Sequence, residues 1–99
     1  MSFQILGTGS ALPARSVPND ELSGFLDTSD EWIFSRTGIK NRRVCTTETL
    51  DDLAVDASCR ALEAAGVDAS ELDLVICSTT TGDHLLPAQA CAVAERLGA

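Results

Sequence analysis

Basic residues are scarce in this sequence. Its 99 residues include seven Lys and Arg against fifteen Asp and Glu, which gives a formal net charge of −8. A surface of that sign repels phosphate backbones and anionic lipids, which argues against nucleic acid or a membrane as a partner. No apolar run approaches the ~20 residues that a membrane span requires, and no basic and apolar leader opens the chain. We therefore expect a cytoplasmic protein.

Paired metal ligands are also lacking. The one histidine is His84, and the four cysteines, Cys45, Cys59, Cys77 and Cys91, never form a Cys-x-x-Cys pair. Zinc sites usually show paired ligands at short spacing, so we expect no metal. In a reducing compartment these cysteines are expected to be small buried hydrophobic residues and not disulfides.

The pattern of apolar residues predicts an α/β protein. Continuous apolar runs predict strands at residues 3–6 and 74–77 that are covered on both faces. Residues 41–46 predict a short extended segment, and two prolines predict a loop over residues 12–19. Helices are predicted over residues 19–26 with Asn19 as the cap, 28–37 with Thr28 and Glu31 as a capping box, 50–65, and 87–97, with one capped turn at 68–71.

The two apolar runs cannot build a sheet alone. Strands that are apolar on both faces need neighbours along both edges and helices over both faces. The chain ends, at residues 95–99, where a helix stops and a third strand would follow. We therefore expect residues 1–99 to be part of a larger domain, with a complete small two-layer domain as the alternative.

Thr28, Trp32 and Arg36 recur at a spacing of four, which places them on one side of a helix. A hydroxyl, an indole and a guanidinium together suit a nucleotide, because the indole can stack on a base and the guanidinium can bind phosphate. A simpler interpretation is also open. Trp32 would then be a core residue, Arg36 would interact with the helix dipole, and Thr28 would only cap the helix.

The residues around this stripe resemble a known family. DTSDEWI at residues 27–33, followed by RTGI at 36–39, is similar to a signature of β-ketoacyl-acyl carrier protein synthase III. ILGTGS at 5–10, the alanine-rich helix at 51–66 and the segment at 79–87 resemble the same family. The resemblance implies a thiolase-like layered α/β sandwich, of which residues 1–99 would be an incomplete N-terminal portion of the first half.

The resemblance also implies an acyltransferase of fatty-acid biosynthesis. In the family a cysteine takes an acyl group from acyl-CoA, and this group condenses with malonyl-acyl carrier protein with loss of carbon dioxide. The implied partners are acyl-CoA, acyl carrier protein and a second copy in a homodimer. Coenzyme A is a substrate carrier there, and no cofactor is implied.

Individual residues take implied roles by matching the family's motif. Trp32 would stack on the adenine of coenzyme A, and Thr28, Arg36 and Thr37 would contact the same molecule. Leu86 matches a position, often aromatic in the family, that reaches into the partner's acyl pocket, and its leucine predicts an altered or wider pocket.

No residue is assigned to catalysis. Cys91 falls within a predicted helix where the family has a structural residue, and His84 does not match the family's histidine, so the chain alone is expected to be inactive. Two alternatives remain: a related acyltransferase of secondary metabolism, and a non-catalytic remnant that binds coenzyme A or a partner. The basic cluster of Lys40, Arg42 and Arg43 could meet phosphate or an acidic carrier, although a solvated face is the simpler interpretation.

Overall fold

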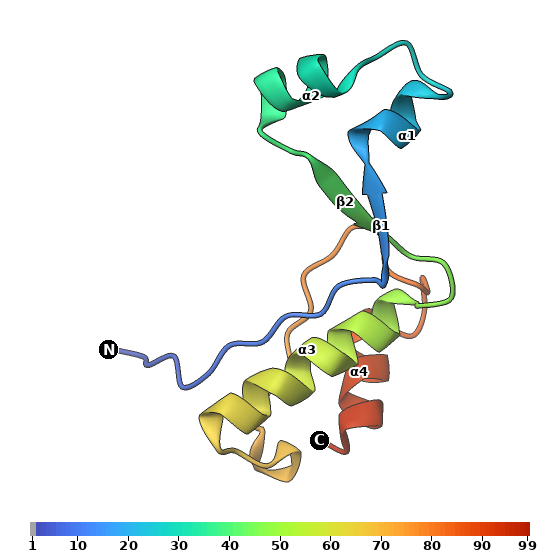
Figure 1. The fold of residues 1–99 in the computed structure, drawn as a ribbon. Helices are drawn as coiled ribbons and strands as arrows, with labels where there is room; N and C mark the ends of the chain where they lie inside the picture. Colours follow the sequence, from blue (N-terminus) through green and yellow to red (C-terminus); the bar gives the residue numbers. More distant parts are fainter. Residues whose placement is uncertain (1) are drawn as a thin grey trace. The chain divides into compact units, whose positions relative to one another are not determined.

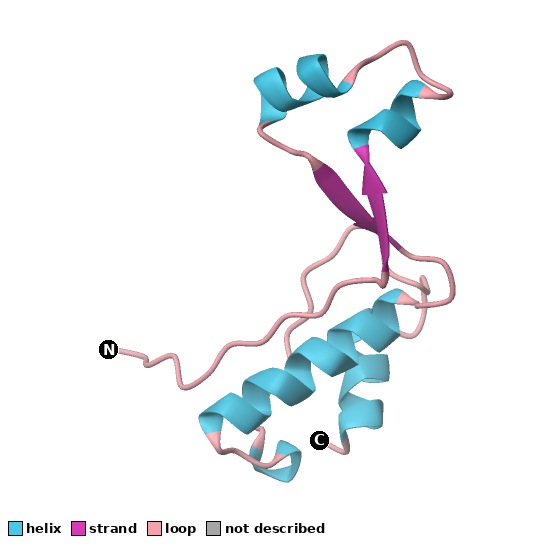
Figure 2. Cartoon of the chain, in the orientation of Figure 1, coloured by secondary structure: helices cyan, strands magenta, loops and turns pink. Residues whose placement is uncertain are grey.

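The computed structural model describes residues 2–99, which fall into two compact units. Residues 12–47 form the small unit, and residues 2–11 with 48–99 form the helical unit. Figures 1 and 2 show the elements of each unit. In chain order they are β1 (Arg15–Pro18), α1 (Asn19–Ser23), α2 (Asp30–Thr37), β2 (Asn41–Val44), α3 (Leu50–Ala65), the 3-10 turn η1 (Ala69–Glu71) and α4 (Gln89–Leu97).

The small unit is built on two short antiparallel strands. β1 pairs with β2 so that Val17 lies opposite Arg42, and the Val17 side chain is buried. This confirms the extended segment predicted at 41–46, whereas the loop predicted over 12–19 was wrong for the residues of β1. Pro18 is tolerated because it is the last residue of β1, and in a sheet of two strands both strands are edge strands.

The helix predicted at 19–26 is shorter than expected, and its predicted cap was wrong. α1 ends at Ser23, its N-cap residue is Pro18, and no side chain caps it. Asn19 is instead the first residue of the helix, and its side-chain amide bonds to residues outside α1. The amide is thus used for tertiary contacts and not for the helix's own N–H groups.

The helical unit contains the helix that the sequence predicted best, α3. Thr49 and Asp52 form a capping box: the Thr49 hydroxyl accepts from the Asp52 amide at 3.1 Å, and the Asp52 carboxylate accepts from the Thr49 amide at 3.0 Å. Gly66, at a φ of 67°, ends the helix in the left-handed region that favours glycine. Among residues 2–99, no helix is long and apolar enough to cross a bilayer.

Two shorter elements complete the helical unit. The turn predicted at 68–71 is confirmed as η1, with a capping box between Asp68 and Glu71. The last helix, α4, begins at Gln89, two residues later than predicted, and packs on α3. Val93 of α4 is 4% exposed and is the buried apolar residue of this unit.

The strands predicted at 3–6 and 74–77 are absent from the described residues. Both runs are irregular backbone without a ladder partner, and Ile5 and Ile76 are 72% and 81% exposed. The first run leads into a segment that lies close against α3, because a Cβ on Gly9 would come within 2.2 Å of the Ala57 carbonyl oxygen. An apolar run becomes a strand only when another strand pairs with its backbone, and residues 2–99 supply none to these runs.

The expectation of buried cysteines was also wrong. Cys45, Cys59 and Cys91 are exposed, Cys77 is half-buried, and all four are free. Cysteine is buried when neighbouring elements cover it. Within residues 2–99, the neighbouring elements leave the thiols of Cys45, Cys59 and Cys91 exposed.

Candidate functional site

The short helix α2 carries the main candidate residues. Ser29 caps its N-terminus by accepting from the Trp32 amide at 3.2 Å, and Gly38 ends it at a φ of 71°. Trp32 and Arg36 are one helical turn apart on the same face, as predicted from their spacing. The Arg36 guanidinium carbon lies 5.5 Å from the centre of the indole ring, within cation–π range.

Trp32 is a surface residue. Its side chain is 56% exposed, so the simpler interpretation of Trp32 as a core residue was wrong. A large half-exposed indole beside a guanidinium can stack on a planar base while the arginine binds an anion. The sequence contains no other tryptophan.

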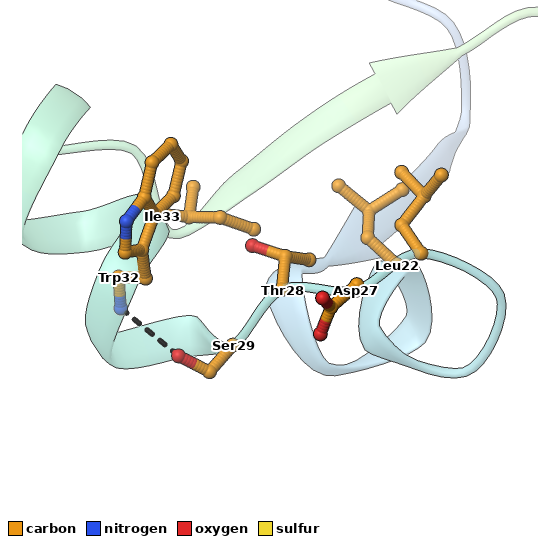
Figure 3. A pocket seen from close by; sticks show the side chains of 7 residues that line it. Leu22, Asp27, Thr28, Ser29, Trp32 and Ile33 are labelled. Carbon is orange, nitrogen blue, oxygen red and sulfur yellow. Dashed lines mark hydrogen bonds between the residues drawn. The ribbon is translucent and has the colours of Figure 1, made fainter.

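A cavity opens beside Trp32 between α1 and α2. Its volume is about 720 Å³, within the range of small-molecule pockets. Figure 3 shows Leu22 facing Trp32 and Ile33 across the opening, with Thr28 between them. The lining is mainly apolar and consists of Leu22, Leu26, Asp27, Thr28, Ser29, Trp32 and Ile33.

Thr28 differs from its predicted place. It was expected to cap α2 with Glu31, but Ser29 is the cap, and Thr28 lies just before the helix. The hydroxyl oxygen of Thr28 is buried and has no hydrogen-bond partner. A buried hydroxyl without a partner is unfavourable unless a ligand or water satisfies it. Thr28 lines the cavity, but its hydroxyl oxygen is covered, so a molecule bound there would reach this oxygen only after the side chain turned toward the cavity.

Thr37 lies at the other end of α2. Its hydroxyl donates to the Ile33 carbonyl oxygen at 2.7 Å and accepts from the Ile39 amide at 3.0 Å. The donor is therefore already used, and only a second lone pair remains for an outside group. Its contact with coenzyme A stays a prediction.

Leu86 belongs to the helical unit. It lies in the loop before α4 and is 88% exposed, next to Leu85 at 99%. Such exposure of adjacent leucines fits an apolar contact surface, and the contact across a dimer stays a prediction.

The basic cluster is largely occupied by structural contacts. Arg42 donates to the Val17 carbonyl oxygen at 3.1 Å and to the Asn19 side-chain oxygen. Arg43 donates to the Pro13 carbonyl oxygen at 3.0 Å, and the Lys40 ammonium lies 5.1 Å from the Phe34 ring centre. The solvated face expected here is confirmed for Lys40 and Arg43, which are exposed, whereas Arg42 is half-buried and holds β1 and Asn19 in place.

The two residues that might have invited a catalytic interpretation lie apart from this cavity in the chain. Cys91 is on α4, and His84 Nε2 lies 3.4 Å from an Asp51 carboxylate oxygen at the start of α3. Within residues 2–99, no three His, Cys, Asp or Glu side chains are grouped to hold a metal ion.

The sequence did not reveal the apolar wall of the cavity. Leu22, Leu26 and Ile33 line it, and none of the three was assigned to a site from the sequence. A spacing pattern along one helix cannot show which residues of a second helix will face it. The only sequence signal was the closeness of two predicted helices, at 19–26 and 28–37, on either side of the DTS segment at 27–29.

Comparison with known proteins identifies related sequences. No protein-family model matches the chain. β-Ketoacyl-[acyl-carrier-protein] synthase III of Xanthomonas axonopodis is 54% identical over 96% of this chain, and that of Clostridium acetobutylicum is 47% identical over 99%. The chain spans 30% of the length of each of these relatives.

Solved structures agree with this result. The 3-oxoacyl-[acyl-carrier-protein] synthase III of Aquifex aeolicus matches at a TM-score of 0.95 and 42% identity, covering 98% of this chain and 32% of that one. The priming β-ketosynthase of the R1128 polyketide pathway matches at a TM-score of 0.92 and 46% identity, covering 96% of this chain and 29% of that one. The predicted α/β thiolase-like fold class is confirmed. In sequence and in fold, the chain corresponds to the N-terminal portion of the β-ketoacyl-[acyl-carrier-protein] synthase III family.

Proposed function

We propose that the cavity of the small unit binds the nucleotide end of coenzyme A. The observation that carries this proposal is the exposed indole of Trp32 with the Arg36 guanidinium 5.5 Å from its ring centre. An adenine ring would stack on the indole, and Arg36 would bind phosphate through its donor fork. With its side chain turned toward the cavity, the unpartnered Thr28 hydroxyl would bond to the base, and Thr37 would make a contact near Arg36.

The proposed activity of the whole protein follows from its relatives. It would condense acyl-CoA with malonyl-acyl carrier protein, as an acyltransferase that begins fatty-acid synthesis in the cytoplasm. Coenzyme A would be a substrate carrier, and no resident cofactor is proposed. We further propose that the whole protein is a homodimer in which Leu86 enters the partner's acyl pocket. No nucleophile is assigned within these 99 residues.

A second candidate is a condensation in secondary metabolism. The match to a polyketide priming ketosynthase at 46% identity supports it. The curated relatives at 54% and 47% identity both carry the synthase III name, which favours the fatty-acid pathway.

Titration of the chain with coenzyme A tests the binding proposal. Trp32 is the sole tryptophan, so quenching of its fluorescence reports stacking directly. We expect saturable quenching by coenzyme A and by adenosine 3′,5′-bisphosphate, and none by phosphopantetheine, which lacks the base. Equal quenching by phosphopantetheine would contradict the assignment of the cavity to the nucleotide.

Incubation with acetyl-CoA tests the expectation that this chain is inactive. We expect no gain of an acetyl mass on the intact protein. Acylation of Cys91, located by peptide mapping, would show that the residue roles given above are wrong.

A further inference from the structure

One side chain of the small unit is fully buried, and it is polar. Asn19 is 1% exposed, although its unit is small and its neighbours Asp20 and Pro18 are exposed. Burying an amide is unfavourable unless its donors and its acceptor are hydrogen-bonded. A buried asparagine at this place therefore needs a reason beyond filling space.

Every hydrogen-bonding atom of the Asn19 amide is satisfied. Its nitrogen donates to an Asp30 carboxylate oxygen at 2.8 Å and to the Ile39 carbonyl oxygen at 2.7 Å. Its oxygen accepts from the Arg42 guanidinium, and its backbone amide donates to the Lys40 carbonyl oxygen at 3.1 Å. Both donors and the acceptor are thus used within the unit.

The bond from Asn19 to Asp30 joins the two helices, α1 and α2, that carry opposite sides of the cavity. Asn19 is the first residue of α1, and Asp30 is the first residue of α2. Leu22 follows Asn19 by three residues on one wall, and Trp32 follows Asp30 by two on the other. Asn19 itself does not line the cavity, so it can act only through the placement of α1 and α2.

We propose that Asn19 is a positioning residue for the nucleotide cavity. Its bond to Asp30 fixes the start of α2 against the start of α1, and this sets the opening between Leu22 and Trp32. The bond to Ile39 and the contact with Arg42 fix the far end of α2 through the turn that follows it. The inference rests on the proposed function, because the nucleotide end of coenzyme A is the ligand whose fit this opening controls.

Asp30→Ala is the sharpest test, because it removes the bond between the helices and leaves Asn19 and its other partners in place. Asp30 is exposed, so the variant is expected to fold. Glu31→Ala is the matched control, since it removes the same charge from the same first turn of α2 without touching Asn19. We expect Asp30→Ala to weaken coenzyme A binding about tenfold, since misplacement of a binding group lowers affinity steeply, and Glu31→Ala to leave it within about twofold.

A paired exchange provides the rescue. In Asn19→Asp, two carboxylates face each other and binding should fall at least as far as in Asp30→Ala. Adding Asp30→Asn restores a donor and an acceptor with their roles reversed, so binding should partly return. If Asn19→Asp fails to fold, the comparison of Asp30→Ala with Glu31→Ala decides alone.

Acrylamide quenching of Trp32 separates this inference from the proposed function, because it needs no ligand. Positioning by Asn19 predicts that Asp30→Ala changes the quenching constant of Trp32 and that Glu31→Ala does not. It also predicts that the paired exchange restores the wild-type constant. If the unaltered chain fails to bind coenzyme A, the proposed function falls and quenching still decides the role of Asn19. Wild-type binding and quenching in Asp30→Ala, or equal losses in Glu31→Ala, would overturn the inference.

Discussion

The two units of the chain differ in how their backbone hydrogen-bonding groups find partners. In the small unit, β1 and β2 pair with each other, and Asn19 joins both helices and the α2–β2 turn. In the helical unit, two apolar runs at 3–6 and 74–77 remain without partner strands, although α3 and α4 are well formed. A local set of contacts can therefore complete the cavity of the small unit, while the two apolar runs of the helical unit pair with no described segment.

The difference extends to how glycine is used. In the helical unit, Gly7 and Gly9 let the N-terminal segment lie against the backbone of α3 at Ala57, Ala61 and Ala65. In the small unit, Gly24 has ordinary helical φ and only the Glu21 carbonyl oxygen near its missing Cβ, at 3.3 Å. Close packing of backbone on backbone thus belongs to the helical unit.

The largest effect should come from Gly9→Ala. Its Cβ would lie 2.2 Å from the Ala57 carbonyl oxygen and 2.6 Å from the Ala61 amide nitrogen, and neither backbone atom can move away alone. Overpacking of this kind lowers the free energy of unfolding by about 3 kcal/mol. Thermal unfolding followed by circular dichroism measures the loss.

Gly24→Ala is the control for that prediction, and it should change stability little. Equal losses in both variants would show that the two units do not differ in their tolerance of a methyl group.

The next effect concerns binding and is confined to the small unit. Trp32→Ala should weaken coenzyme A binding by about 2 kcal/mol, roughly thirtyfold, because a base stacked on an aromatic ring contributes about 1–3 kcal/mol. Calorimetric titration is the measurement, since the fluorescent reporter is lost. Because Trp32 is 56% exposed, the unfolding temperature should change little.

Phe34→Ala is the matched control on the same helix. Phe34 is 45% exposed and contacts Lys40, but it does not line the cavity. Its removal should leave binding unchanged, and a comparable loss in both variants would indicate that any aromatic residue of α2 serves equally.

The sequence was sufficient to predict features that depend on residues close together in the chain. The start of α3 follows from its capping box, and the ends of α2 and α3 follow from Gly38 and Gly66. Trp32 and Arg36 lie together because residues four apart share a helix face. Each of these depends on residues within one or two turns of each other.

Two kinds of feature could not be read in this way: the choice between adjacent residues of equal chemistry, and contacts between distant segments. The choice between Thr28 and Ser29 as the cap depends on how the chain enters the helix, and both residues have a suitable hydroxyl. The burial of Asn19 depends on Asp30, Ile39 and Arg42, which are 11 to 23 residues away. The apolar runs at 3–6 and 74–77 met no partner strand within residues 2–99.

The smallest effect should come from Asp52→Asn and depends on pH. Hydrogen bonds from the Thr49 amide and from Arg96, whose Nη1 lies 2.9 Å from the carboxylate, hold the pKa of Asp52 below its ordinary value of 3.8. A carboxyl group whose pKa is lowered by folding stabilises the fold at any pH above its pKa in the unfolded chain. This contribution is lost as the pH falls through its pKa in the folded chain. Chemical unfolding should therefore show that the wild type is more stable than Asp52→Asn at neutral pH. The difference should be smaller than the loss in Gly9→Ala, and it should shrink below pH 3.8.

The small unit offers the contrast, because Ser29 caps α2 with a hydroxyl that does not titrate in this range. Ser29→Ala should therefore lower the free energy of unfolding by a similar amount at neutral pH and below pH 3.8. If Asp52→Asn lowered the free energy of unfolding equally at both pH values, the negative charge of the Asp52 carboxylate would make no contribution to stability.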